Sequence, residues 1–334
     1  MGAIEHYIQS NVFTAWGVII LSFVVLFKSA DIFVEASVGL AERFRVPRLV
    51  IGIVLVSLAT TAPELTVSLM AALRGNPEIA LGNAIGSVIC DDGLALGLAG
   101  VCTVAPIVIV PSVLKSSGVF LIAIQLITFL FVARDFTLER WEGVVLVMLF
   151  AGYICFLFRQ HARGELREAA VPDVGKKRRA SAVKLLILFI CALAGIIVAS
   201  EFVITSAITI ARSFHISEGV IALTLVALGT SVPEVATCIT AARKGEGAIA
   251  VGNILGADIM NICWVAGASA IAHDLTLGKK DIMFMFPSMF IIVGVMLVML
   301  RMGYTHSRSK GLILFCLYLC YLVSFFVFFP PQLS

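Results

Sequence analysis

The sequence predicts an all-α polytopic membrane protein with ten transmembrane helices, arranged as two inverted repeats of five helices each. Three observations predict this fold class. The 334 residues are 60% hydrophobic and 13% charged, with a mean hydropathy of +1.06, and a soluble protein could not cover that much apolar surface. The apolar residues fall into windows long enough to cross a bilayer. One pattern of polar residues occurs twice, 170 positions apart.

Each predicted span is a window of about 20 apolar residues, the length that crosses a bilayer as a helix. The first five windows are residues 14–40, 47–73, 78–104, 113–133 and 141–158. The last five are residues 184–211, 217–242, 247–272, 282–300 and 311–329. The chain therefore divides into a first membrane repeat at 1–158, a basic linker at 159–183 and a second membrane repeat at 184–334.

The linker predicts the orientation of the protein in the membrane. Its basic residues are Arg159, Arg163, Arg167, Lys176, Lys177, Arg178 and Arg179. Because Lys and Arg concentrate in cytoplasmic loops, we expect an integral protein of the cell membrane with the linker in the cytoplasm and both termini outside. Lys279 and Lys280 fall on the outer side and count against this orientation, although Asp274 and Asp281 flank them.

Five spans on each side of the linker make the two repeats enter the membrane in opposite directions, because five is an odd number. Many secondary transporters consist of such inverted repeats, with the substrate site at mid-membrane between the halves. The alternative is an ancient duplication that is kept only for packing. Packing alone favours small residues and does not require carboxylates and amides at equivalent positions.

The duplicated pattern is a Pro-Glu pair followed by a Gly-Asn-x-x-Gly segment. Its matching residues are Thr60 and Thr230, Pro63 and Pro233, Glu64 and Glu234, Gly82 and Gly252, Asn83 and Asn253, Gly86 and Gly256, and further upstream Asp31 and Glu201. The register holds over roughly thirty residues without a gap, which is not expected by chance.

Pro63 and Pro233 each lie in the middle of a predicted span. Proline has no N–H and its ring crowds the preceding turn, so the carbonyl groups of Ala59 and Gly229 are expected to lose their helical partners. Inside a membrane, such carbonyls must be satisfied by protein, water or a cation. A simple proline kink would explain the break but not the glutamate after each proline, because a carboxylate within a bilayer is costly.

One helical face in each copy carries hydroxyl and carboxylate oxygens. The residues on these faces, spaced i, i+3, i+4 and i+7, are Ser57, Thr60, Thr61 and Glu64, and then Ala227, Thr230, Ser231 and Glu234. Hard cations such as Na⁺ and Ca²⁺ prefer oxygen ligands. Since neither motif contains histidine, zinc and copper are disfavoured.

The next span of each repeat adds a second polar stripe. Its members are Asn83, Ser87 and Asp91 in the first repeat, and Asn253, Ala257 and Asn261 in the second. Neighbouring glycines permit close helix approach, whereas buried Asn and Asp require partners. If the halves meet at mid-membrane, Glu64, Glu234 and Asp91 face one negative cluster that only cations or protons make tolerable. Asp92 lies about 100° around the helix from Asp91, and the spacing leaves its role open.

The two motifs resemble the paired α-repeats of the cation/calcium exchanger superfamily, especially its sodium/calcium exchanger branch, over essentially the whole chain. This resemblance implies ten helices, alternating access and exchange of Na⁺ for Ca²⁺, with no cofactor beyond the transported ions. The implied ligands are Glu64 and Glu234, shared by both ions, the threonines Thr60 and Thr230, which offer main-chain oxygen, and the hydroxyls of Thr61, Ser231 and Ser87. Ser57, Asn83, Asp91, Asn253 and Asn261 complete the predicted ion-binding set.

The chain departs from the family pattern at three places. Residues 59–61 are Ala-Thr-Thr, where the family usually has Gly-Thr-Ser. Ala257 replaces a usual serine and so removes one expected Na⁺ ligand. Asp91 stands where many members carry Asn, and Asn261 stands where some carry Asp. These departures leave open whether Na⁺, H⁺ or K⁺ drives transport, and with what stoichiometry.

Three classes of protein compete for these residues: a secondary antiporter, a passive cation channel and an intramembrane hydrolase. The Pro-Glu pairs lack the carboxylate motif of an intramembrane protease, so we do not expect an enzyme. The residues alone do not separate an antiporter from a channel, and the resemblance favours the antiporter. The expected partners are Ca²⁺, Na⁺ and the lipid bilayer, without nucleic acid, and the oligomeric state stays open.

Overall fold

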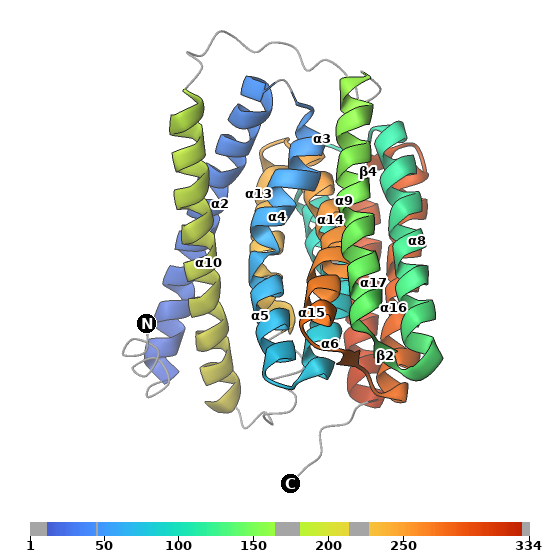
Figure 1. Cartoon of the computed structure of the whole chain (residues 1–334). Coiled ribbons are helices and arrows are strands. Elements are labelled where there is room, and N and C mark those ends of the chain that lie inside the picture. The colour runs from blue at the N-terminus through green and yellow to red at the C-terminus, as the bar shows by residue number, and fades with distance from the viewer. Residues whose placement is uncertain (1–11, 45, 164–180, 214–226, 329–334) are drawn as a thin grey trace.

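The computed structural model describes residues 12–44, 46–163, 181–213 and 227–328, which form a bundle of helices (Figure 1). Within these residues, eight helical segments are long and apolar enough to cross a membrane. A ninth span is broken, because Arg48–Thr60 and Ala62–Leu73 meet at 45°. The seventh predicted span, 217–242, begins outside the described residues. The predicted all-helical, multi-span architecture is confirmed.

The helices of the first half are α2 (Val12–Phe44), α3 (Arg48–Ile51), α4 (Ser57–Thr60), α5 (Ala62–Leu73), α6 (Pro77–Cys90), α7 (Leu96–Cys102), α8 (Pro111–Asp135) and α9 (Arg140–Ala162). The described helices of the second half are α10 (Ala182–Ser213), α12 (Ala227–Thr230), α13 (Val232–Arg243), α14 (Gly247–Met260), α15 (Gly267–Ala272), α16 (Lys279–Arg301) and α17 (Arg308–Phe328). The π-helical segments are η1 (Gly52–Val56), η2 (Asp91–Ala95) and η4 (Asn261–Ala266). Five pairs begin 170 residues apart: α2 and α10, α4 and α12, α5 and α13, α6 and α14, and η2 and η4.

Helices α6 and α14 lie at the centre of the bundle, whereas α2 and α10 pack against each other at its edge (Figure 1). In the span Gly247–Ala272, 83% of the apolar window is buried, against 22% in Ala182–Ile210. The polar stripes that the sequence predicts therefore lie on the helices with the most protein around them.

Two tight turns connect the helices that carry the duplicated motif. Gly75 joins α5 to α6 with a φ of +78°, and Gly245 joins α13 to α14 with a φ of +75°. Glycine is favoured at both, because other residues rarely adopt this left-handed conformation. The two turns lie at opposite ends of the bundle (Figure 1).

Two short antiparallel strand pairs link the halves. Strand β1 (Ile107–Val108) pairs with β4 (Thr305–His306), and β2 (Thr137–Leu138) pairs with β3 (Leu275–Thr276). The pairs lie at opposite ends of the bundle (Figure 1). Hydropathy does not predict these strands, since they are only two residues long.

Glycines let α14 approach the first half closely. A Cβ atom at Gly252 or Gly256 would collide with the main-chain oxygen of Leu49 or Ile53. The Ser57 hydroxyl also lies against Gly256. The predicted close helix approach is confirmed here, and it brings α4 next to the polar stripe of α14.

Candidate functional site

Both prolines of the duplicated motif lie directly after a break in their helix. The break in the first half is at Thr61, between α4 and α5, and its counterpart is at Ser231, between α12 and α13. Each proline occupies the first turn of the following half-helix, where its missing N–H costs nothing. The glutamate after each proline therefore lies at a helix N-terminus inside the bundle, where backbone N–H groups favour negative charge.

Glu64 and Glu234 are completely buried, and neither oxygen of either carboxyl group accepts a normal hydrogen bond from the described residues. A buried carboxylate without a partner is unfavourable, because it has lost its water and gained nothing in exchange. The Glu64 carboxyl lies close enough to Glu234 and Asp91 for their charges to interact. The site thus concentrates negative charge that a cation would stabilise.

The two halves exchange hydrogen bonds at the break. Thr60 donates to Oδ1 of Asn253 at 3.2 Å, and Thr230 donates to Oδ1 of Asn83 at 3.2 Å. Each threonine hydroxyl also lies beside the glutamate of the other half, Thr60 near Glu234 and Thr230 near Glu64. The sequence predicted all these side chains as a site, and the structure brings them together across the two halves.

Asn83 and Asn253 are anchored from behind in equivalent ways. The Asn83 amide donates to Ser68 Oγ at 3.0 Å, and the Asn253 amide lies 3.6 Å from Cys238 Sγ. Ser68 and Cys238 are themselves 170 positions apart. Because their amide groups are held in this way, the oxygen of each asparagine faces the threonine of the opposite half.

Asp91 and Asn261 occupy equivalent positions and contact each other. The Asn261 amide donates to Oδ2 of Asp91 at 3.3 Å. Each is the first residue of a π-helical segment, η2 or η4, and such segments are frequent at functional sites. Since residues with the same place in the two halves meet here, an axis relating the halves would pass between them.

The predicted hydroxyl ligands differ in their surroundings. Ser87 and Ser231 are fully buried, and their hydroxyls have no hydrogen-bond partner among the described residues. The Thr61 hydroxyl donates to the Ser57 carbonyl and lies 3.5 Å from Met260 Sδ. The Ser57 hydroxyl donates to the Ile53 carbonyl. Ser87 and Ser231 are thus the hydroxyls most available to an ion.

The structure adds an acidic residue that the motif comparison missed. Asp258 on α14 is completely buried, and its carboxyl group faces that of Asp92 on η2. Asp92, whose role the spacing left open, is equally buried. The comparison of the two motifs does not find Asp258, because the residue 170 positions earlier is Val88. Its charge within an apolar span could have marked it as a candidate, since ionisable residues in such spans are usually functional.

The acidic residues do not converge on a single point. The described residues contain no group of three His, Cys, Asp or Glu side chains that could together hold one metal ion. The expected cluster of Glu64, Glu234 and Asp91 is therefore looser than a compact three-carboxylate site. A cation bound here would also need hydroxyl, amide or main-chain oxygens.

Comparison with known proteins places this arrangement in a family. The chain matches the sodium/calcium exchanger protein family over residues 14–159 and 184–327. It is 28% identical to the sodium/calcium exchanger MaX1 of Methanosarcina acetivorans, covering 92% of this chain and 97% of MaX1. It is 35% identical to the inner membrane protein YrbG of Escherichia coli, covering 80% of this chain and 82% of YrbG.

Solved structures agree with the sequence comparison. A structure of the sodium-calcium exchanger NCX_Mj superposes with a TM-score of 0.79 at 27% identity, covering 94% of this chain and 99% of NCX_Mj. Both halves of the chain match the family, and the similarity extends through nearly all its helices. The chain therefore belongs to the sodium/calcium exchanger protein family.

Proposed function

We propose that this chain is a secondary antiporter that exchanges Ca²⁺ for Na⁺ across a membrane by alternating access. One observation carries the proposal: two broken helices each bury a glutamate whose oxygens have no partner among the described residues. Such carboxylates need a bound cation or a proton to offset the cost of burial. Ions then compete for the same oxygens, so one leaves as another replaces it. Membership in the exchanger family supports this mechanism.

The proposed ion ligands come from both halves. Glu64 and Glu234 supply charge, and the Ser87 and Ser231 hydroxyls supply neutral oxygen. Main-chain oxygens near the two breaks, at Thr60 and Thr230, complete the shell, since Ca²⁺ takes 6–8 oxygen ligands. Further predicted contributors, placed around this centre, are Ser57, Thr61, Asn83, Asp91, Asn253 and Asn261.

We further propose that the complete chain has ten transmembrane helices in two inverted repeats. The equivalent spacing of helix starts and the two glycine turns at opposite ends support this arrangement. So do the paired bonds from Thr60 to Asn253 and from Thr230 to Asn83. Inverted repeats with broken helices meeting at mid-membrane are typical of secondary transporters.

The end of the bundle where α9 finishes and α10 begins is proposed to face the cytoplasm, with both termini outside. The helix ends found here carry basic residues: Arg48 starts α3, Lys244 follows α13 and Arg308 starts α17 (Figure 1), in line with the positive-inside rule. Arg134, in the last turn of α8, lies at the other end and counts against this orientation.

The decisive experiment is uptake of radiolabelled Ca²⁺ into proteoliposomes containing the purified chain. We expect an outward Na⁺ gradient to drive uptake and an outward H⁺ gradient to be ineffective. Uptake driven by H⁺ alone would identify an H⁺-coupled antiporter. Uptake that requires K⁺ as well as Na⁺ would identify a K⁺-dependent exchanger. Ca²⁺ entry without any counter-ion would identify a passive channel.

A further inference from the structure

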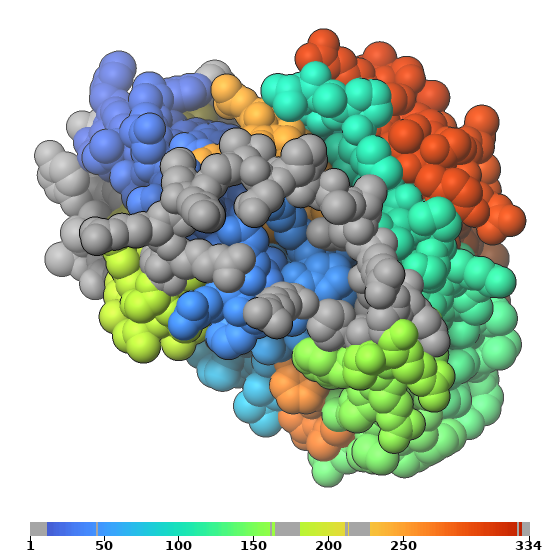
Figure 2. Space-filling view, turned by 90° about the horizontal axis from the view of Figure 1, so that it is seen from above, coloured from blue at the N-terminus to red at the C-terminus, as the bar shows by residue number. Residues whose placement is uncertain are grey.

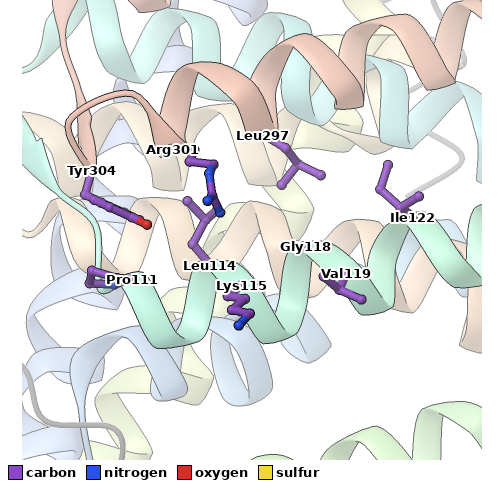
Figure 3. A pocket seen from close by; sticks show the side chains of 9 residues that line it. All are labelled: Pro111, Leu114, Lys115, Gly118, Val119, Ile122, Leu297, Arg301 and Tyr304. Carbon is purple, nitrogen blue, oxygen red and sulfur yellow. The ribbon is translucent and has the colours of Figure 1, made fainter.

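A groove between α8 and α16 lies away from the proposed ion site. It encloses about 300 Å³. Its lining residues are Pro111, Leu114, Lys115, Gly118, Val119, Ile122, Leu297, Arg301 and Tyr304 (Figure 3). None of these residues belongs to the buried polar stripes, so a molecule bound in the groove would not touch the proposed ion ligands.

The groove opens on the outer surface of the bundle. Val119 is 66% exposed and Ile122 is 36% exposed, although both are large and apolar. The start of α8 and the end of α16 lie side by side at the rim of the molecule (Figure 2). In a membrane-spanning bundle this apolar surface faces lipid, so the groove can accept an acyl chain.

One end of the groove is cationic. Arg301 and Lys115 lie at this end with Tyr304, whereas Val119 and Ile122 extend toward the other (Figure 3). Lys115 and Arg301 are exposed, and neither forms an ion pair with a carboxylate of the described residues. Lys115 also lies near the N-terminus of α8, where the helix dipole favours an anion.

We propose that this groove binds one anionic phospholipid from the leaflet at the end of the bundle where α9 finishes and α10 begins. The phosphate lies between Lys115 and Arg301, and one acyl chain follows Val119, Ile122 and Leu297. Two basic side chains without ion pairs, at one end of an apolar groove, complement a lipid that carries net negative charge. Basic pockets between transmembrane helices on the cytoplasmic side recognise such headgroups. A zwitterionic lipid fits less well, because its own cation opposes the two basic side chains.

Native mass spectrometry of the full chain can test this proposal. The protein in detergent is titrated with phosphatidylglycerol and, separately, with phosphatidylcholine of the same acyl chains. We expect tighter binding of phosphatidylglycerol. The variant Lys115→Gln/Arg301→Gln should lose about 25-fold in affinity for it, since each basic side chain near a headgroup contributes about fivefold. Inorganic phosphate should not displace the lipid, because it cannot occupy the apolar part of the groove.

The matched control is Lys279→Gln/Lys280→Gln, which removes two charges from the opposite end of the same helix. This control should keep wild-type affinity. Equal binding of the two lipids, an equal loss in the control, or unchanged binding in Lys115→Gln/Arg301→Gln would each overturn the proposal. Lys115→Gln alone is a second variant, because this exposed side chain can change without affecting the fold.

Discussion

The negative charge of the proposed ion site comes from buried carboxyl groups without hydrogen-bond partners among the described residues. Glu64 and Glu234 lie at equivalent half-helix starts and are buried to the same degree. The next polar layer is unequal, because Asp91 carries a charge and its counterpart Asn261 does not. Single substitutions can therefore separate residues that bind ions from residues that only pack.

Glu64→Gln and Glu234→Gln are each expected to abolish Ca²⁺ exchange. Loss of a buried charge partner costs about 3–5 kcal/mol, which corresponds to a hundredfold or greater loss of ion affinity, about 1.4 kcal/mol per factor of ten. Both variants should be at least as stable as wild type, because a charged side chain costs about 2.5–3.5 kcal/mol at mid-membrane. Ca²⁺ flux and unfolding temperature check this, with the exposed Glu78→Gln as control. Near wild-type flux in either variant would remove these glutamates from the site.

Asp91→Asn and Asn261→Ala are expected to differ although the positions are equivalent. Asp91→Asn removes a charge and should change both the Na⁺ and the pH dependence of exchange. Asn261→Ala removes one hydrogen bond, so its effect on Ca²⁺ affinity should not exceed about tenfold. Flux measured over a range of Na⁺ concentrations and pH separates the two. Equal and negligible effects would mean that this layer only packs helices.

Ala257→Ser is expected to lower the half-saturating Na⁺ concentration with little change in Ca²⁺ affinity. The added hydroxyl is a neutral oxygen, and Ca²⁺ affinity depends mainly on carboxylates. Ala257 is completely buried one turn from Asn253 and one turn from Asn261. Na⁺ activation curves at fixed Ca²⁺ and pH provide the measurement. Coincident curves for variant and wild type would exclude position 257 as a ligand site.

At the scale of helices, the site depends on irregular geometry that close packing supports. The breaks at Thr61 and Ser231 turn one span into two half-helices, and the π-helical segments η2 and η4 begin at Asp91 and Asn261. Such departures from regular hydrogen bonding persist only where neighbouring elements hold them. Helix α14, packed against η1 and α4, is one of these supports.

Gly256→Ala and Gly152→Ala should therefore change stability in opposite directions. A Cβ at Gly256 would collide with the Ile53 backbone, which cannot move aside as a flexible side chain can, and overpacking of this kind costs about 1–3 kcal/mol. At Gly152 on α9 the added methyl group meets nothing among the described residues, so the variant should gain about 0.5–1 kcal/mol of helix propensity. The unfolding temperatures of the two variants and of wild type, measured in the same detergent, provide the comparison. A neutral Gly256→Ala would show that α14 and η1 separate easily.

At the scale of the whole molecule, the halves are joined at both ends as well as at the centre. His306 on β4 lies in the strand pair that connects α7 and α8 to α16 and α17. It is fully buried, and its Nε2 donates to the Leu96 carbonyl at 3.0 Å. Gly100 makes room for the ring, because a Cβ there would collide with it.

Acid should weaken this connection. Burial lowers the pKa of His306 below its usual value of 6.5, and the positive charge of Lys310 adds to the effect. A neutral folded histidine contributes stability above about pH 6.5, which is lost as the pH falls through the lowered folded pKa. His306→Gln keeps a donor for Leu96, so its unfolding temperature should fall less between neutral and acidic pH. The exposed His273→Gln serves as control, and identical pH profiles for all three proteins would contradict the expectation.

The sequence by itself determined the spans and the duplicated motif. Hydropathy alone places spans because lipid excludes charged and unpaired polar groups along a whole segment, and the predicted 247–272 agrees with Gly247–Ala272. The constant spacing predicted that residues such as Glu64 and Glu234 form one site, since duplicated sequence folds into duplicated structure. The helix break after Thr61 likewise follows from local chemistry, because Pro63 cannot donate a hydrogen bond.

Only the tertiary structure decided which residues meet. The contacts of Thr60 with Asn253 and of Asp92 with Asp258 join segments more than 160 positions apart, and no local pattern encodes such distances. The strand pairs are too short to leave a periodic signal. The groove at Lys115 and Arg301 exists because α8 and α16 lie side by side. The spacing of residues along a helix determines which face each one occupies. How the helices pack determines which other helix that face contacts.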